Sequence, residues 1–171
     1  MKKGTRGFSL IELLIVVAII LIIAAIAIPN LLRSRIAANQ SSAVGSLRTL
    51  NTAEVTYAST YNTGFSSTLG DLGPPPSATN PVATAAGLVD EILSGSAAAG
   101  ATATTSSKSG YQFTYSTTGT DMSGKIDVYS ITATPVSVGT TGTNFYYTDQ
   151  SGVIRQNSTA VAGSTDSPLA G

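Results

Sequence analysis

The sequence predicts an α+β protein in which a long N-terminal helix is followed by a C-terminal antiparallel β-sheet. An unbroken apolar run from Leu13 to Ile28 is followed by apolar residues at helical spacing as far as Tyr61. Beyond Tyr111, aromatic and β-branched residues alternate with polar ones in short segments that are separated by turn residues. The chain of 171 residues is long enough for one modest domain in addition to an extended helix.

The apolar segment has the length of a membrane span. At about 1.5 Å per residue, a helix from Phe8 to Ile28 reaches about 30 Å, which is one hydrocarbon thickness. The basic residues Lys2, Lys3 and Arg6 precede it and predict a cytoplasmic N-terminus, with the remainder outside.

Glu12 lies at the start of this apolar run. An acidic side chain within a membrane helix costs roughly 2.5–3.5 kcal/mol on insertion scales, so Glu12 is expected to be functional and to need a positive partner. Cleavage after Gly7 would create a cationic amine on Phe8, one helical turn from Glu12. The two charges are natural partners, either within one chain or between neighbouring chains.

Three interpretations of the first thirty residues compete. A secretory signal peptide fits the basic start and the small residues around Ala25-Ile26-Ala27, but its apolar region would be unusually long. A plain membrane anchor fits the length of the helix. An anchored stage followed by extraction into a filament accounts for Gly7, Phe8 and Glu12 together, and we adopt this third interpretation.

The segment Gly7-Phe8-Ser9-Leu10-Ile11-Glu12 resembles the class III leader cleavage site of type IV pilins and of the related pseudopilins of type II secretion. The stretch that follows, including Pro29, resembles the pilin N-terminal helix, and the resemblance covers roughly residues 2–35. It implies that a membrane aspartic peptidase cuts after Gly7 and methylates the amine of Phe8. It also implies that Glu12 is the assembly carboxylate and that the chain has the pilin fold.

The resemblance implies three parts: a cleaved leader at 1–7, a long helix at 8–61 with a transmembrane and filament-core segment at 8–28, and a globular head at 62–171. Pro29 is expected to kink the helix. Leu21 stands where family members often carry glycine, which would make this helix stiffer than usual.

The helix is expected to stop at Asn62-Thr63-Gly64. The head is then expected to contain a short helix at 86–93, an exposed loop at 94–109, four strands at 111–116, 125–133, 144–149 and 153–156, and a loosely held tail at 158–171.

Composition argues against an enzyme. Histidine and cysteine are absent, which excludes familiar zinc sites, Ser-His-Asp and Cys-His nucleophiles, and attached c-type haem. A tethered enzyme would need an Asp-only or Ser/Lys mechanism, for which no motif is present. We therefore expect no catalysis and no cofactor. Removing Lys2, Lys3 and Arg6 leaves six basic and nine acidic side chains, so no specific nucleic-acid partner is predicted.

Weaker candidate sites lie in the head and on the helix. Asp121, Asp127 and Asp149 could bind calcium, as in major pseudopilins, but their spacing forms no EF-hand loop and turn capping is preferred. Asn157-Ser158-Thr159 matches an N-glycosylation pattern. Arg33, Arg35 and Arg48 could bind nucleic acid or anionic headgroups, although a solvated helix face is the simpler interpretation.

The predicted function is that of a structural subunit of a type IV pilus, serving adhesion, motility or DNA uptake; the alternative is a type II secretion pseudopilin. The expected partners are other copies of the chain, a prepilin peptidase and methyltransferase, an inner-membrane assembly platform, and the membrane before assembly. The precursor is expected in the bacterial inner membrane with a periplasmic head, and the assembled form in an extracellular pilus.

Overall fold

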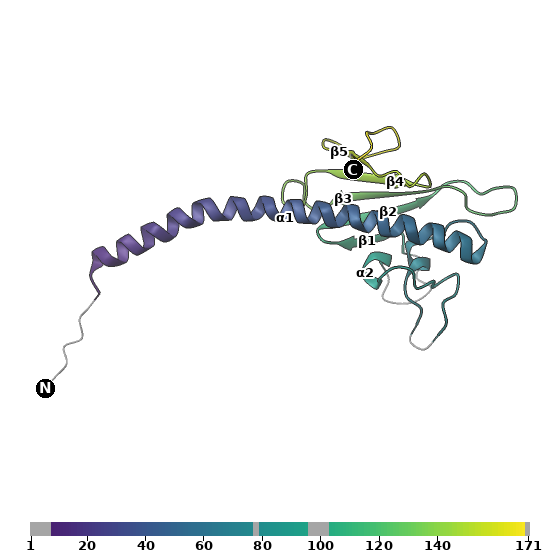
Figure 1. Cartoon of the computed structure of the whole chain (residues 1–171), viewed down its shortest axis with the longest axis horizontal. Coiled ribbons are helices and arrows are strands. Elements are labelled where there is room, and N and C mark those ends of the chain that lie inside the picture. The colour runs from purple at the N-terminus through teal and green to yellow at the C-terminus, as the bar shows by residue number, and fades with distance from the viewer. Residues whose placement is uncertain (1–7, 77–78, 96–102, 170–171) are drawn as a thin grey trace. The chain divides into compact units, whose positions relative to one another are not determined.

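The computed structural model describes residues 8–76, 79–95 and 103–169 of the chain. The chain divides into two compact units, residues 1–35 and 36–171. Helix α1 (Leu10–Tyr61) runs through both units and is followed by the elements of the second unit (Figure 1). These are η1 (Leu69–Leu72), α2 (Glu91–Ser94), β1 (Thr105–Lys108), β2 (Tyr111–Thr117), β3 (Tyr129–Pro135), β4 (Phe145–Asp149) and β5 (Arg155–Asn157).

In the first unit, the apolar side chains of α1 are exposed to solvent. The large apolar residues from Leu10 to Leu32 are each more than two-fifths exposed. By length and composition, α1 is the one helix in the described part of the chain that could cross a membrane. The helix continues through Pro29 without interruption. So large an apolar surface is characteristic of a segment that lipid or neighbouring chains cover.

The end of α1 is as predicted. The helix ends at Tyr61, and Asn62 adopts a left-handed conformation with φ of 55° while its amide still donates to the carbonyl of Ala58. Gly64 is also left-handed, with φ of 83°, and lies against Ile126, whose carbonyl accepts from the amide of Phe65 at 2.8 Å. Asn and Gly are the residues that adopt this conformation at least cost, which explains the stop.

Gly64 is expected to be one of the least replaceable residues of the second unit. In Gly64→Ala the new Cβ would meet the backbone of Ile126 in addition to the left-handed strain. Gly152→Ala is the matched control, because φ there is 72° but nothing lies within 4 Å of the Cβ position. We expect the control to lower the free energy of unfolding by about 1 kcal/mol and Gly64→Ala by about 2 kcal/mol more, measured by denaturant unfolding in detergent. Equal losses would contradict the close packing of Gly64.

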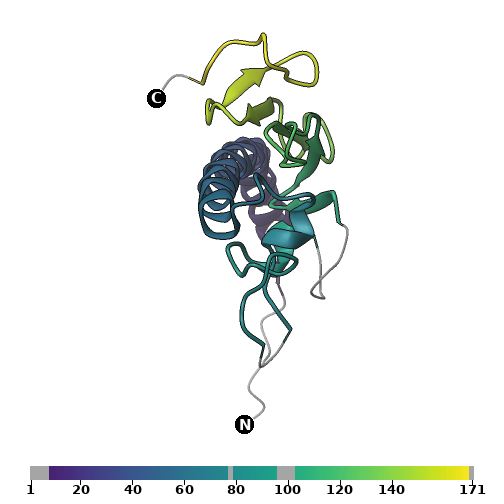
Figure 2. The same ribbon diagram turned by 90° about the vertical axis from the view of Figure 1, so that its right-hand side faces the viewer.

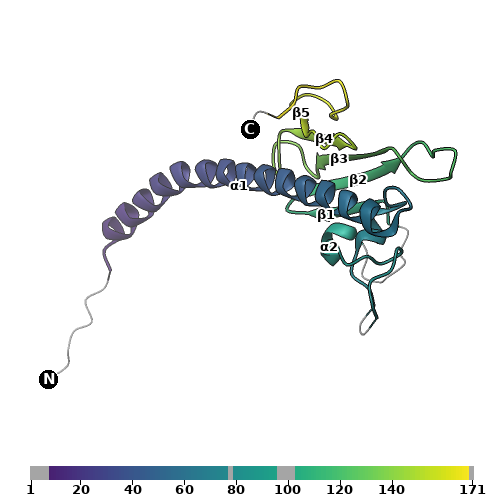
Figure 3. The ribbon, with the colours of Figure 1, turned by 45° about the vertical axis from the view of Figure 1, so that its right-hand side comes forward.

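The five strands form one antiparallel sheet in the order β1-β2-β3-β4-β5 (Figure 3). Its core face is built by alternate residues of the central strands, such as Tyr111, Phe113 and Tyr115 of β2, all of them buried. In the second unit, α1 lies along this face of the sheet (Figure 2) and contributes Leu47, Leu50 and other buried residues to the same cluster. The α+β arrangement predicted from the sequence, a long helix with an antiparallel sheet, is therefore confirmed.

The predicted strand bounds are partly wrong. β2 and β4 match within a residue, whereas β3 begins at Tyr129 rather than at 125 and β5 begins at Arg155 rather than at 153. The residues just before β3 form a turn instead, in which the amide of Asp121 donates to the carbonyl of Lys125 at 2.9 Å. Alternation of Ile126 and Val128 indicated a strand, but local turn chemistry determines their conformation.

Two predictions about the variable region are also wrong. The helix expected at 86–93 is reduced to Glu91–Ser94, capped by the carboxylate of Asp90. The amides of residues 86–89 donate to carbonyls of Asp71, Leu72 and Gly73, which leaves them unable to form helical hydrogen bonds. The loop expected at 94–109 contains strand β1, whose polar sequence Thr-Ser-Ser-Lys carries no apolar alternation.

The described part of the tail is held rather than loose. The amide of Leu169 donates to the carbonyl of Ile154 at 2.8 Å, and the amide of Gln156 donates to Ser167 at 3.0 Å. Asp166 accepts from the side chain of Asn157 and from the amide of Gly163. These hydrogen bonds fix the segment along the β5 edge of the sheet without a covalent cross-link.

Candidate assembly site

The first turn of α1 brings Glu12 back toward the start of the helix. The backbone amide of Ser9 donates to Oε2 of Glu12 at 2.9 Å, and the carbonyl of Ser9 accepts from the amide of Leu13 at 3.2 Å. Ser9 thus occupies the N-cap position and Glu12 the third helical position, the two ends of a capping-box pattern. A carboxylate at this position also interacts favourably with the positive end of the helix dipole.

The N–H that donates to Glu12 belongs to the peptide bond between Phe8 and Ser9. The carboxylate therefore lies beside the residue whose amine cleavage after Gly7 would free, and the Phe8 side chain is 77% exposed. Gly7 itself lies outside the described residues. Of the predicted site residues, the structure brings Phe8 and Glu12 close together, and Pro29 lies farther along the same helix.

Immediately after Glu12, the apolar surface is slightly hollowed. Leu10, Leu13, Leu14 and Val17 line an open depression of about 260 Å³ whose walls are almost entirely apolar. It accommodates an aliphatic side chain and offers no group with which to perform chemistry. The Glu12 carboxylate can make a specific polar contact with a partner, and the apolar surface beside it can make a large hydrophobic contact.

Comparison with known proteins gives matches in this same region. Residues 2–28 match the family model described as the prokaryotic N-terminal methylation motif. Over 54 residues the chain is 54% identical to the type IV major pilin protein PilA of Myxococcus xanthus. The aligned residues make up 32% of this chain and 24% of that protein. Over 39 residues it is 59% identical to the type IV wide pilus major component PilA4 of Thermus thermophilus, 23% of this chain and 30% of that protein.

These matches support a type IV pilin. The alignments span less than a third of the length of either curated relative. No solved structure matches the chain. The long apolar helix together with the antiparallel sheet is a pilin-like arrangement.

The aspartates considered for calcium occupy separate turns. Oδ1 of Asp121 accepts from the amide and hydroxyl of Ser123 and from the amide of Lys125. Oδ1 of Asp149 accepts from the amide of Ser151 at 2.9 Å. Asp127 is exposed. Within the described ranges, no group of three or more His, Cys, Asp or Glu residues gathers as metal ligands would. The hydrogen bonds of Ser123 lower the pKa of Asp121.

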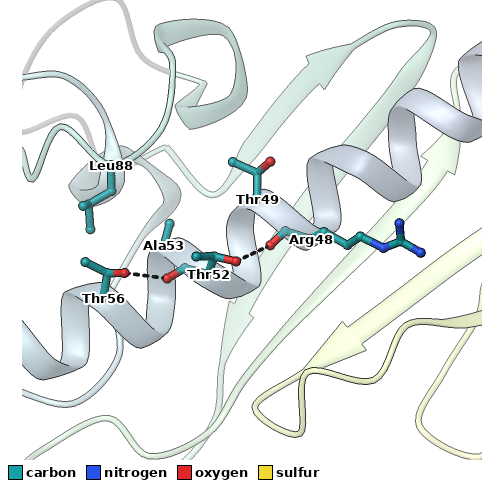
Figure 4. Close-up of a pocket in the computed structure, with 6 residues that line it drawn as sticks. All are labelled: Arg48, Thr49, Thr52, Ala53, Thr56 and Leu88. Atoms are coloured by element: carbon teal, nitrogen blue, oxygen red, sulfur yellow. Dashed lines mark hydrogen bonds between the residues drawn. The ribbon is translucent and has the colours of Figure 1, made fainter.

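The outward face of α1 in the second unit carries hydroxyl groups that are already satisfied. Thr49, Thr52 and Thr56 each donate to the carbonyl four residues earlier, at distances of 2.8–3.1 Å. Figure 4 shows two of these hydrogen bonds in an open pocket of about 340 Å³, which Leu88 and Arg48 also line. The face thus presents mainly methyl groups and a single charge, and it contains no constellation suited to catalysis.

Sequence reasoning missed Glu54, the most deeply buried charged residue of the second unit. Its side chain is 0% exposed, and its oxygens accept from the amide of Ser66 at 2.9 Å and from the Ser66 hydroxyl at 2.6 Å. The carbonyl of Ser66 in turn accepts from the hydroxyl of Tyr115 at 2.7 Å. Burial raises the pKa of Glu54, although the hydrogen bonds of Ser66 oppose this shift. The missed signal was a glutamate placed four residues after Leu50 and three before Tyr57, on the apolar stripe.

The N-glycosylation pattern falls on an engaged side chain. Nδ2 of Asn157 donates to Asp166 at 2.9 Å, while its Oδ1 accepts from the amides of Thr159 and Ala160. The nitrogen to which a sugar would be attached therefore holds the C-terminal segment. In this structure Asn157 acts as a structural residue.

Proposed function

We propose that the chain is a structural subunit of a type IV pilus that is processed after Gly7, methylated on the amine of Phe8, and polymerised through its apolar helix. The observation that carries the proposal is the Glu12 carboxylate, which binds the Ser9 amide at the head of an exposed apolar helix. The curated relatives are named as major components of type IV pili, which supports the same function.

The charge argument explains how one residue would control polymerisation. In a filament the lipid is gone, and Glu12 would be surrounded by aliphatic side chains of neighbouring helices. An unpaired buried carboxylate is unfavourable by several kcal/mol, and the Phe8 amine of an incoming subunit would relieve this cost. The ion pair would then set the axial register, while apolar packing of the helices would hold the filament together.

We propose the following life cycle for the chain. Residues 1–7 form the leader, 8–28 the membrane-spanning and filament-core segment, and 62–171 the head. The precursor would lie in the bacterial inner membrane with its N-terminus cytoplasmic and its head periplasmic. A prepilin peptidase and methyltransferase would process it, and an inner-membrane platform would assemble it into an extracellular homopolymer. We propose no catalytic activity and no cofactor, and adhesion, motility or DNA uptake would follow from the filament.

The outward face of α1 in the second unit is suited to contact a neighbouring subunit. Its threonine hydroxyls donate to helix carbonyls, so covering them leaves no donor unpaired. Val55 lies among them and is 64% exposed. In the part of the chain that the structure describes, Arg48 makes no salt bridge.

Val55→Glu is expected to fold normally and to yield fewer filaments, because a carboxylate would be desolvated in the subunit contact. An exposed substitution of this kind changes the free energy of unfolding by only about 0.5 kcal/mol. Val161→Glu is the control, because Val161 is 58% exposed but lies in the C-terminal segment. The measurement is the mass of sheared fibres for each variant at equal cellular levels of subunit. Equal yields from the two variants would exclude this face of α1 from the filament contacts.

Electron microscopy of sheared surface fibres, combined with mass spectrometry of their subunit, tests the proposed function. We expect filaments whose subunit begins at a methylated Phe8. A mature chain that retains its first seven residues, or one that begins beyond Ile28, would refute the proposal.

A further inference from the structure

A compact loop joins β3 to β4 at the end of the second unit where α1 enters it. The side chain of Asn39 donates to the carbonyl of Thr141 at 2.9 Å, and the side chain of Gln40 donates to the hydroxyl of Thr143 at 2.8 Å. The loop, residues 136–144, is therefore fixed to the first turns of α1 within this unit.

The loop displays two valines to solvent, Val136 and Val138, which are 65% and 63% exposed. Hydrogen bonds fix the backbone on both sides of them. The amide of Val136 donates to the carbonyl of Gly110 at 3.0 Å, and the amide of Gly139 donates to that of Gly142 at 2.8 Å. Gly142 packs so closely on Tyr111 that a Cβ would collide with its ring.

The loop and the adjoining turns of α1 carry no charge of their own. Residues 136–144 contain no acidic or basic side chain, and neither does α1 between Ile36 and Leu47. Two of the loop hydroxyls are engaged, since that of Thr141 donates to the carbonyl of Ser137 and that of Thr143 accepts from Gln40. Moving such a surface into the polar edge of a bilayer requires no desolvation of charge, and it covers apolar area at a gain of about 25 cal/mol per Å².

Chain connectivity sets the distance between this loop and the membrane. The apolar run that would span the bilayer ends at Ile28, and Arg33 and Arg35, both exposed, follow it within two helical turns. Long basic side chains at the end of a membrane helix reach the lipid phosphates. Asn39 comes four residues after Arg35, which is about 6 Å along a helix. The loop that Asn39 holds is thus tethered within a few ångströms of the headgroup level.

We propose that the loop at 136–144 is a membrane-contact surface that inserts Val136 and Val138 among the lipid headgroups of the bilayer holding the precursor. This inference rests on the membrane stage of the proposed function. The contact would restrict the orientations of the head before assembly, and it would have to be broken when the subunit leaves the membrane.

The chain contains no tryptophan, so a single introduced tryptophan reports its own surroundings. The full chain carrying Val138→Trp would be reconstituted into vesicles of phosphatidylethanolamine and phosphatidylglycerol, with or without acyl chains brominated near the headgroup. Val161→Trp serves as the exposed control, and Ile20→Trp, measured with acyl chains brominated near their ends, reports on the membrane stage itself. Val136→Trp repeats the measurement if Val138→Trp does not fold.

We expect the emission of Val138→Trp to shift to the blue and to be quenched by brominated lipid several-fold more than that of Val161→Trp. If Ile20→Trp is quenched but Val138→Trp responds only as Val161→Trp does, the membrane contact is refuted and the proposed membrane stage remains. If Ile20→Trp is not quenched, the membrane stage fails and the contact fails with it. A blue shift that grows with protein density but ignores brominated lipid would assign the loop to a second copy of the chain, which also overturns the proposal.

Discussion

Glu12→Gln is expected to enter the membrane and to be processed, but to give few or no filaments. The amide side chain keeps the size of glutamate and can still accept the hydrogen bond of the Ser9 amide, which the carboxylate accepts at 2.9 Å. It cannot, however, neutralise the amine of an incoming Phe8. That amine would be buried without a counter-charge, and breaking a buried ion pair in this way costs about 3–5 kcal/mol.

The measurement for Glu12→Gln is the ratio of sheared filament to membrane-bound subunit, with mass spectrometry of the subunit to establish cleavage and methylation. Glu91→Gln is the control for removal of one negative charge, because Glu91 is exposed in α2. Cleavage that proceeds normally would show that the peptidase still recognises the variant. A normal filament yield from Glu12→Gln would remove the charge-pairing argument.

The second large effect is expected at Glu54, which has no connection with the membrane segment. In Glu54→Leu the amide and hydroxyl of Ser66 lose the acceptors that they bind at 2.9 and 2.6 Å. Buried donors left unsatisfied cost about 1–3 kcal/mol each, so the loss of two lowers the free energy of unfolding by about 2–6 kcal/mol. Glu54→Gln keeps an oxygen for the Ser66 amide and should lose much less. Denaturant unfolding of the full chain in detergent distinguishes the two variants.

The pH dependence of stability follows from the same residue. Burial raises the pKa of Glu54 above its ordinary value of 4.5, with a smaller contribution from the charge of Asp71. The folded state therefore holds this proton more tightly than the unfolded state does. The free energy of unfolding should fall as pH rises from 4.5 through the raised pKa, because deprotonation then favours the unfolded chain.

Glu54→Gln should remove this fall, since the amide does not titrate. Asp90 and Asp121 do not confound the measurement, because their pKa values are lowered from 3.8 and their effects come at lower pH. An identical decline with pH in the wild type and in Glu54→Gln would show that another group is responsible. A variant that unfolds at every pH would instead indicate that Ser66 needs a full negative charge.

The sequence was sufficient to predict the elements whose patterns are long or regular. The apolar run predicts a helix by its length. The stripe through Leu47 and Leu50 and the alternation of Tyr111, Phe113 and Tyr115 each bury one face, so their periodicity predicts the structure directly. The stop at Asn62 was also predictable, because left-handed conformations favour few residue types.

The elements that were mispredicted depend on contacts between distant parts of the chain. Strand β1 forms because Thr105–Lys108 pairs with β2, and its own sequence gives no sign of this. The helix expected at 86–93 is shortened because carbonyls near η1 capture four of its amides. Glu54 was missed for a related reason. Its hydrogen-bond donors belong to Ser66, which lies beyond the end of α1, so the helical pattern gives no sign of the contact.

Hydrogen bonds of Asp166 and Asn157 hold the C-terminal segment along β5. This bears on the cellular conditions under which the head can fold. Since the chain contains no cysteine, closing this region requires no oxidant and no isomerase that shuffles sulfur bridges. A host that lacks oxidative folding enzymes could produce the same head, and reducing agents would leave it intact.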